Sequence, residues 1–322
     1  MDEALVKLAH GIVMMKYPFE VMDELQFNSL CFAQQNTNLY AVIEGGKPPQ
    51  GYQTTGALIY TLEQQPTAHP LLISLGNNDL LDVSPWLVKV TPDSLLYYWL
   101  IENSAIHPFV LFWSQATLQH LVSYMVNLLT VTSPQGGPLF FRYYDPTVLA
   151  VMITHGSDSE MFSRMGPVSG VAAFSDAHES YESGWNIRWF ESTEPVTVDP
   201  PLAVTLNESE WQAMGDLRSR VSIKQMMSYL RDFYPDHLLN VDSNTLQSFV
   251  TTSIDKGRLF GFNTQAELEQ WVDLQIYFGN GFEHESRYSW AKTILDNPQS
   301  TPGEKLQTLN LYLDQYQARS VS

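Results

Sequence analysis

An apolar and aromatic run at residues 139–144, followed at once by a helix-start signal, most constrains what this chain can fold into. The run reads Leu-Phe-Phe-Arg-Tyr-Tyr, so both of its faces are apolar or aromatic, apart from one charge at Arg142. A strand covered on both faces has this pattern. Asp145 is a favoured N-cap, and Pro146 fits the first helical position because its missing N–H would be unpaired there. The sequence therefore predicts a buried strand that leads directly into a helix.

Strands and helices alternate along the first part of the chain. Apolar runs predict strands at residues 39–43, 71–75, 86–90, 108–113, 139–144, 168–174 and 185–190. Thr91 with Pro92, Ser114 and Asp145 are the expected start signals of the intervening helices. This alternation predicts a mixed sheet with some parallel crossovers.

The composition changes after residue 205 to a series of amphipathic helices. Asn207 with Glu210, and Thr264 with Glu267, have the spacing of capping boxes, and apolar residues follow each pair at helical spacing. We therefore expect an α+β protein with a mixed α/β N-terminal domain at residues 1–190, a linker at 191–205 and an all-helical C-terminal lobe at 206–322.

The net charge of −18 excludes some classes of partner. Residues 1–200 carry seven Lys and Arg against 20 Asp and Glu, so the acidity is concentrated in the first part. Such a surface repels a phosphate backbone or an anionic membrane and attracts a basic protein. We expect no nucleic-acid binding, although the charge can also serve solubility alone.

The single cysteine and the N-terminal residues indicate the cellular compartment in which the protein is expected to act. Cys31 lies among apolar neighbours, which predicts a buried, inert thiol and fits a reducing compartment. The first residues are acidic where a signal peptide needs positive charge, and no stretch approaches 18 consecutive apolar residues. The expected location is the cytoplasm, without membrane insertion.

Motifs for common catalytic, metal and cofactor sites are absent from the sequence. There is no Gly-x-Ser-x-Gly and no phosphate-binding glycine loop, and the densest acid–His cluster, Glu283–Glu285, is interpreted as a solvated loop. We expect no catalytic residue, metal or cofactor. His155, Ser157 and Asp158 stand close in sequence, but members of a catalytic triad usually converge from separate segments.

Four segments together resemble the type VI secretion adaptor family, bacterial chaperones that load toxic effectors onto the secretion spike. They are the early strand Asn38–Gly46, the Trp-Leu strand Ser84–Val90, the helix Leu118–Val131 that contains His120, and the signature Pro138–Leu149. The resemblance covers residues 25–170, and the helical tail is similar to the C-terminal part of many members.

The resemblance implies a cytoplasmic adaptor that binds the N-terminal part of a secreted toxic effector and presents it to the C-terminal region of the spike protein. Because the family signature lies there, the predicted partner-binding residues are Arg142, Tyr143, Tyr144, Asp145 and Trp86. Two alternatives stay open: a hydrolase with an unrecognised site, and an immunity-like protein that neutralises the toxin.

Structural roles compete with partner binding at several of these positions. Asp145 can act purely as a helix cap. Arg142 can pair with a nearby carboxylate or a helix C-terminus, since an unpaired buried charge costs several kcal/mol. The aromatic run Tyr97–Trp99 is expected mainly in the core, but Trp and Tyr dominate binding hot spots, so it remains a candidate contact.

Overall fold

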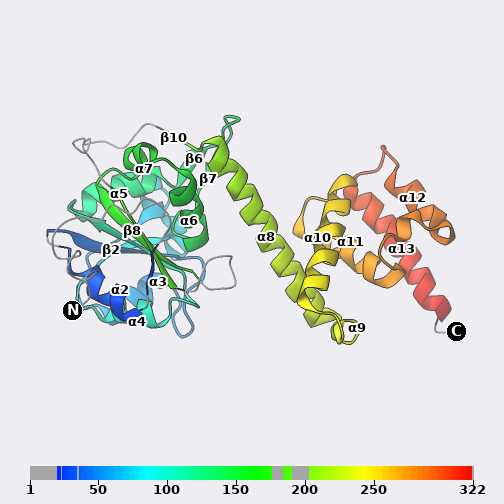
Figure 1. The fold of residues 1–322 in the computed structure, drawn as a ribbon, viewed down its shortest axis with the longest axis horizontal. Helices are drawn as coiled ribbons and strands as arrows, with labels where there is room; N and C mark the ends of the chain where they lie inside the picture. Colours follow the sequence, from blue (N-terminus) through cyan, green and yellow to red (C-terminus); the bar gives the residue numbers. More distant parts are fainter. Residues whose placement is uncertain (1–19, 23, 35, 176–183, 191–202, 321–322) are drawn as a thin grey trace. The chain divides into compact units, whose positions relative to one another are not determined.

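The chain divides into two compact units, residues 1–215 and 216–322 (Figure 1). The computed structural model describes residues 20–22, 24–34, 36–175, 184–190 and 203–320. Both sheets lie in the first unit and the second is helical, which confirms an α+β fold with an all-helical C-terminal lobe. The domain boundaries at residues 190 and 206 stay predictions, and most of the expected linker, residues 191–202, lies outside the described residues.

Seven of the described strands form the main sheet, in the order β1-β9-β8-β5-β2-β4-β3. Their bounds, in that order, are Glu20–Met22, Gly184–Trp189, Val168–Ser175, Phe109–Ser114, Asn38–Ile43, Trp86–Val90 and Ala68–Pro70. Every neighbouring pair runs antiparallel, so the expectation of parallel crossovers is wrong for this sheet. The helical connection from β4 to β5 does join strands of the same direction, but β2 lies between them and pairs with both.

Helices cover both faces of this sheet (Figure 1). One layer contains α2 (Glu24–Cys31), α3 (Thr55–Leu62) and α4 (Leu95–Glu102), and the other contains α5 (Leu118–Asn127), α6 (Pro146–His155) and α7 (Asp158–Met165). Side chains of β2 alternate between the two cores: Tyr40 and Val42 face the α5–α6 layer, and Leu39, Ala41 and Ile43 face the α3–α4 layer. The central strands are buried on both sides, as their continuous apolar sequences predict.

Three local predictions are wrong because a competing signal lies nearby. Residues 71–75 form a 3₁₀ helix, η1 (Leu71–Leu75), that follows Pro70 and ends at the left-handed Gly76. The N-cap of α4 is Ser94, three residues after the expected Thr91. The N-cap of α5 is Thr117 rather than Ser114. Ser114 is the last residue of β5, and its hydroxyl donates to the Pro167 carbonyl at 2.7 Å.

A second, three-stranded sheet lies beside the α5–α6 layer. Its described strands have the order β10-β6-β7, with bounds Val204–Thr205, Thr130–Thr132 and Pro138–Phe140. Strand β10 pairs parallel with β6 and leads into α8 (Glu208–Phe233). The end of the expected linker is therefore a strand of the first unit.

The second unit packs its helices around Trp271. Beyond α8 they are α9 (Pro235–Leu238), α10 (Ser243–Leu259), α11 (Gln265–Phe278), η4 (Phe282–His284), η5 (Ser286–Tyr288), α12 (Ser289–Leu295) and α13 (Pro302–Ser320). The Trp271 indole is buried and donates to the Ser253 carbonyl at 2.9 Å. Both expected capping boxes are confirmed. Within the described residues, no helix is both long and apolar enough to span a membrane.

Candidate functional site

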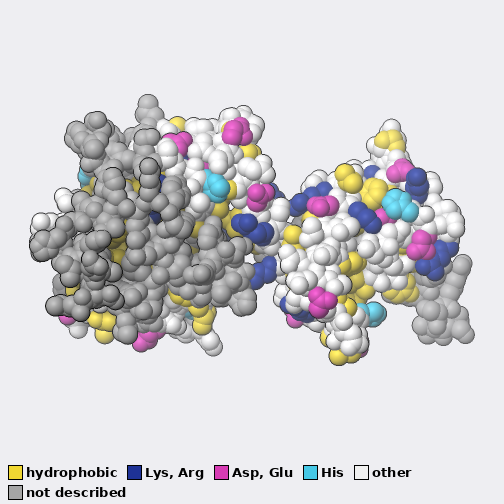
Figure 2. Space-filling model, viewed as in Figure 1, with side chains coloured by type: hydrophobic (Ala, Val, Ile, Leu, Met, Phe, Trp, Pro, Cys, Tyr) yellow, Lys and Arg dark blue, Asp and Glu magenta, His cyan; other side chains and the backbone are white. Residues whose placement is uncertain are grey.

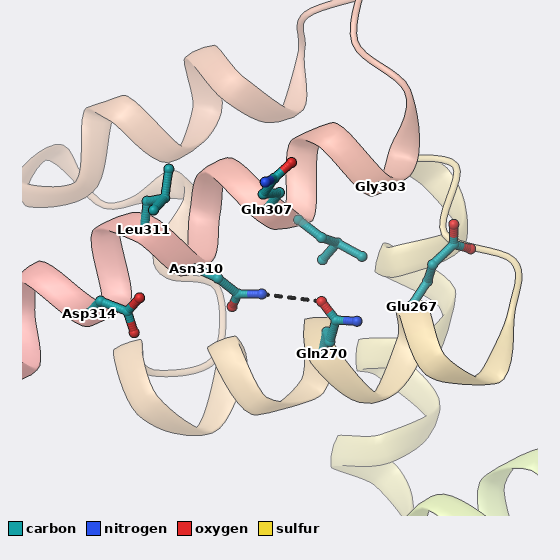
Figure 3. Close-up of a pocket in the computed structure, with 8 residues that line it drawn as sticks. Glu267, Gln270, Gly303, Gln307, Asn310, Leu311 and Asp314 are labelled. Carbon is teal, nitrogen blue, oxygen red and sulfur yellow. Dashed lines mark hydrogen bonds between the residues drawn. The ribbon is translucent and has the colours of Figure 1, made fainter.

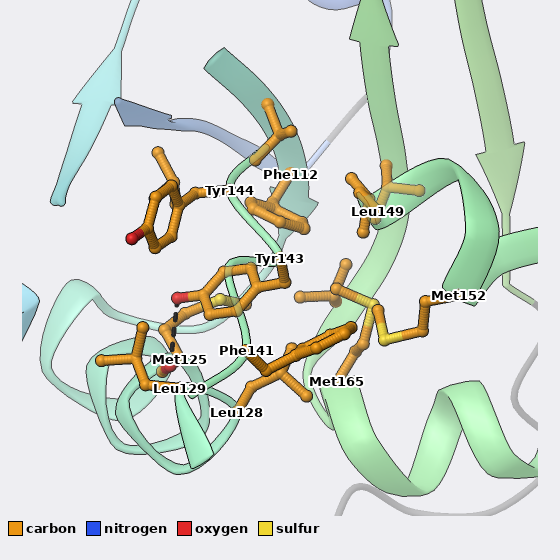
Figure 4. Close-up of a cluster of buried hydrophobic side chains, with 14 of the residues drawn as sticks. Phe112, Met125, Leu128, Leu129, Phe141, Tyr143, Tyr144, Leu149, Met152 and Met165 are labelled. Carbon is orange, nitrogen blue, oxygen red and sulfur yellow. Dashed lines mark hydrogen bonds between the residues drawn. The ribbon is translucent and has the colours of Figure 1, made fainter. Parts of the chain in front are cut away.

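The signature segment is a short edge strand followed by a turn, and not the buried strand that its sequence predicts. Strand β7 ends at Phe140, whose ring is 54 % exposed, and the chain then turns with the Asp145 N–H donating to the Arg142 carbonyl at 2.9 Å. Phe141 and both tyrosines enter the core from this turn (Figure 4). The apolar run at residues 139–144 is therefore not the sign of a strand covered on both faces. Its rings enter the core from a turn, where side chains need not alternate between two faces.

Tyr143 and Tyr144 line the core between the sheet and α5–α6. The Tyr143 ring is fully buried, and its hydroxyl donates to the Met125 carbonyl at 3.0 Å (Figure 4). Burial raises the pKa of Tyr143 well above its ordinary value. Burial also raises the pKa of Tyr144, while the nearby Arg142 guanidinium acts in the opposite direction. Both rings anchor the turn, leaving Arg142 as its outward-facing side chain.

Asp145 and Arg142 have the structural roles that the sequence allowed. The Asp145 carboxylate accepts from the Thr147 N–H at 3.0 Å, so Asp145 is confirmed as the N-cap of α6. The Arg142 guanidinium binds the Glu44 carboxylate at 2.5 Å and lies 5.7 Å from the Tyr144 ring centre. Its side chain is 43 % exposed, so this surface ion pair contributes about 0–1 kcal/mol to stability and presents a cation to solvent.

Trp86 lies on the other face of the sheet from the two tyrosines. It begins β4 in register with Ile43 and belongs to the α3–α4 core, where a Cβ on Gly56 would come within 2.8 Å of the indole. Glu44, which follows Ile43, connects the two sides: its carboxylate binds Arg142, and its carbonyl accepts from the Thr55 hydroxyl at 2.7 Å.

The structure thus brings four of the five predicted partner-binding residues into one turn and places Trp86 across the sheet. Their role in partner binding stays a prediction. Sequence reasoning missed Glu44 as the partner of Arg142, although Glu44 stood in one of the segments that carried the family resemblance. The two residues are 98 positions apart, and no local pattern links them.

The side chains around His155 make local contacts at the ends of α6 and α7 and at the start of α8. The Ser157 hydroxyl donates to the Glu160 carboxylate at 2.8 Å and accepts from the Glu160 N–H at 3.3 Å. Hydrogen bonds from Ser157 are the main reason that the pKa of Glu160 is lowered. His155 Nδ1 lies 2.9 Å from the Ser209 hydroxyl, while its carbonyl accepts from the Asn207 amide at 3.3 Å. Nothing is described for the Asp158 side chain. These contacts connect α6 and α7 to the start of α8.

The described residues hold no group of three or more His, Cys, Asp and Glu arranged to bind a metal. The interpretation of Glu283–Glu285 as a solvated loop is wrong for Glu283, which is 2 % exposed. Its carboxylate accepts from the Gln275 amide at 3.1 Å and lies 3.4 Å from the Lys256 ammonium. Buried charge is stable only when it is paired, and these neighbours supply that pairing.

A shallow groove of about 370 Å³ runs between α11 and α13 (Figure 3). The Asn310 amide donates to the Gln270 amide oxygen at 3.1 Å across it, and carboxylates of Glu267 and Asp314 also line it. The Glu267 carboxylate is already occupied by the backbone N–H groups of Asn263 and Thr264 at 2.9 Å. The groove is lined by amides, carboxylates and two leucines, and no His, Cys or Ser is among its lining residues.

Comparison with known proteins gives two matches. Residues 39–161, from β2 into α7, match a family described as "Domain of unknown function (DUF4123)". The chain is also 22 % identical over 199 residues to "Accessory protein VasW" of Vibrio cholerae serotype O1 (strain ATCC 39315 / El Tor Inaba N16961). That alignment spans 62 % of this chain and 61 % of the relative's length. No solved structure matches.

Proposed function

We propose that this chain, whose residues 39–161 belong to the DUF4123 family of type VI secretion adaptor domains, binds a secreted effector and helps to load it onto the spike protein. The family match carries this proposal, because it falls on the segments that gave the sequence resemblance. Similarity to an accessory protein adds support. The resemblance to the type VI secretion adaptor family is thereby confirmed, while effector binding and spike loading are the proposal.

The proposed mechanism is differential binding in the cytoplasm, without enzyme chemistry. The adaptor holds the N-terminal part of the effector and releases it when the C-terminal region of the spike competes for the complex. The acidic character of the first 200 residues supports a basic binding partner. His155 Nδ1 lies beside the Ser209 hydroxyl and the Ser157 hydroxyl donates to the Glu160 carboxylate, so both side chains have structural partners, which supports binding over hydrolysis.

The first test is an affinity pull-down of the tagged full-length chain from its native cell, with mass spectrometry of the co-eluting proteins. We expect an effector and a spike protein to co-elute at low salt, and a weaker yield at moderate salt because exposed charges are screened. If neither protein is recovered at either salt concentration, or if the effector is exported normally from cells that lack this chain, the proposal is wrong.

A second test separates an adaptor from an immunity protein. Target cells that express this chain alone are challenged with the effector. An adaptor is expected to leave them sensitive, because it binds a delivery segment and leaves the toxic domain free. Survival of these cells would instead support neutralisation of the toxin.

The role of Arg142 can be tested by charge reversal. Arg142→Glu should weaken effector binding if the exposed guanidinium contacts the partner, and adding Glu44→Arg should restore the ion pair without restoring binding. Arg287→Glu is a matched control, since Arg287 also binds a neighbouring carboxylate at 2.5 Å and lies 4.7 Å from a tyrosine ring centre. Equal binding by wild type, Arg142→Glu and the control would assign Arg142 a purely structural role.

A further inference from the structure

Helix α4 is apolar on its outer face as well as on its inner face. Its sequence is Leu-Leu-Tyr-Tyr-Trp-Leu-Ile-Glu, and its inner residues pack into the α3–α4 core. Leu95 and Tyr98, one turn apart on the outside, are 63 % and 51 % exposed. A helix on a protein surface normally carries polar residues on its outer side, and one that is apolar all round is normally covered. The expectation that the aromatic run lies in the core is right for Tyr97 and wrong for Tyr98.

Two neighbouring side chains extend this apolar surface. Tyr60 on α3 is 60 % exposed, and Ile106, just beyond the end of α4, is 74 % exposed. The Glu63 carboxylate at the end of α3 accepts from the Leu96 N–H at 3.0 Å, which holds the two helices together. We call Tyr60, Leu95, Tyr98 and Ile106 the α4 face. Each of these four side chains is more than half exposed, and clustered exposed apolar side chains often mark interaction sites.

Among the described residues, the charged side chains at the two ends of α4 are negative. Asp93 precedes α4, Glu102 ends it, and both are exposed. Lys89 on β4 belongs to the opposite face of the sheet, because Val88 and Val90 on either side of it point into the α3–α4 core. Figure 2 shows hydrophobic and acidic side chains along the rim of the first unit where Figure 1 places α4.

The three described arginines of the first unit have partners elsewhere. Arg142 and Arg164 bind carboxylates, and Arg188 lies 5.6 Å from the Phe190 ring centre. Lys47 is exposed in the loop that joins β2 to α3. An apolar surface with an acidic border selects an apolar partner with a basic border.

We infer that the α4 face binds a basic amphipathic segment of the partner protein, with apolar residues on Tyr60, Leu95, Tyr98 and Ile106 and with Lys or Arg beside Asp93 and Glu102. This inference rests on the proposed function, in which the partner is the effector. Charge complementarity favours this occupant over a second copy, because two chains of net charge −18 would bring acidic borders together. It disfavours an anionic membrane surface for the same reason.

The test uses the full-length protein and fluorescein-labelled 18-residue peptides in an anisotropy titration. One peptide is an amphipathic Leu/Lys helix, the second replaces Lys by Glu, and the third replaces Leu by Ser. We expect the Leu/Lys peptide to bind at least ten-fold more tightly than the other two. Raising the salt concentration should weaken the binding of the Leu/Lys peptide, because the acidic border contributes through long-range attraction.

Two variants locate the binding surface. Leu95→Ser with Tyr98→Ser should weaken binding of the Leu/Lys peptide at least ten-fold, a loss expected when central apolar contacts are removed. The matched control is Leu259→Ser with Tyr277→Ser, which removes another exposed Leu and Tyr (86 % and 42 % exposed) from helices of the second unit and should leave the affinity unchanged. All four side chains are exposed, so equal urea midpoints should show that both variants fold.

Several outcomes would overturn the inference. The inference is wrong if both double variants bind the Leu/Lys peptide with equal affinity. It is also wrong if the Leu/Lys and Leu/Glu peptides bind equally to the wild type. A dimer in sedimentation equilibrium that is lost in Leu95→Ser with Tyr98→Ser would assign the α4 face to a second copy. Ten-fold tighter peptide binding after deletion of residues 1–19 would assign it to the chain's own N-terminus.

The effector pull-down distinguishes failure of this inference from failure of the proposed function. If the wild type and Leu95→Ser with Tyr98→Ser recover the effector equally, the inference is wrong and the adaptor function stands. If the wild type itself recovers neither effector nor spike, the adaptor function is wrong.

Discussion

Removing the carboxylate of Glu210 should destabilise the first unit more than any change at an exposed acid of the same helix. Glu210 lies in the first turn of α8 and is fully buried, and Arg164 of α7, which binds its carboxylate, is 6 % exposed. The same carboxylate accepts from the Asn207 N–H at 2.7 Å, and the guanidinium also donates to the Thr205 carbonyl at 2.8 Å. This pair therefore joins α7, β10 and the start of α8.

The expected magnitude follows from what Glu210→Ala leaves behind. Removing one partner of a buried ion pair costs about 3–5 kcal/mol, and the buried Arg164 guanidinium would then keep the Thr205 carbonyl and the partly exposed Glu160 carboxylate, 3.7 Å away, as its partners. Loss of the capping box adds about 1 kcal/mol. For a unit of this size, each kcal/mol lowers the melting temperature by about 2–4 °C, so we expect a decrease of about 10 °C or more.

The assay is urea and thermal unfolding followed by tryptophan fluorescence, since six of the eight tryptophans lie in residues 1–215. Glu208→Ala, at an exposed acid in the same helical turn, is the control and should change stability by less than about 0.5 kcal/mol. Replacing Arg164 and Glu210 together by Met should recover most of the loss, because no buried charge remains. The reasoning is refuted if Glu210→Ala behaves like the control, or if the double substitution is as unstable as the single one.

Three further predictions concern a glycine packed against the Ser84 backbone, a half-buried acid and the buried thiol. Gly45→Ala places a Cβ 2.0 Å from the Ser84 carbonyl oxygen and should cost at least about 2 kcal/mol by urea unfolding, whereas Gly46→Ala has no atom nearer than 3.6 Å and should be nearly neutral. Burial raises the pKa of Asp273 against the lowering effect of its tyrosine hydrogen bonds, so its protonated form is favoured in the folded state and its stabilising contribution is lost as pH rises above 3.8. The unfolding free energy of Asp273→Asn relative to wild type should therefore rise between pH 3.5 and 6, and a constant difference would contradict this. Burial raises the pKa of the Cys31 thiol to about 12, so it should react with a disulfide reagent at pH 8 only after unfolding in urea, and rapid reaction of the folded protein would be inconsistent with the structure.

Most of the helix starts and the class of the fold could be predicted from the sequence. Asp145 before Pro146, Asn207 with Glu210, and Thr264 with Glu267 all cap helices as expected. A cap is decided by a side chain and the backbone of the next three residues, so the information lies within one turn. Where two caps competed, as at Thr91 and Ser94, the sequence did not decide between them.

The strand predictions are correct where a buried apolar segment also has a paired strand on each side. They are wrong where the side chains are buried from a turn. Residues 39–43 and 86–90 lie in central strands, and both of their faces are covered. Residues 139–144 have the same apolar pattern, yet they form a short edge strand and a turn whose rings enter the core. An apolar pattern reports that side chains are buried, and it does not report whether the backbone has a partner on each side.

The sequence by itself determined the α+β class, the helical C-terminal lobe, the acidic balance and the family resemblance, because each of these is summed over many residues or fixed within a few neighbouring ones. Tertiary structure alone decided that β2 lies between β4 and β5. It also decided that Arg142 binds Glu44, 98 residues away, and that Tyr98 faces outward while Tyr97 is buried. These features depend on contacts between distant segments, whose positions follow from the packing of the whole unit and from no local preference.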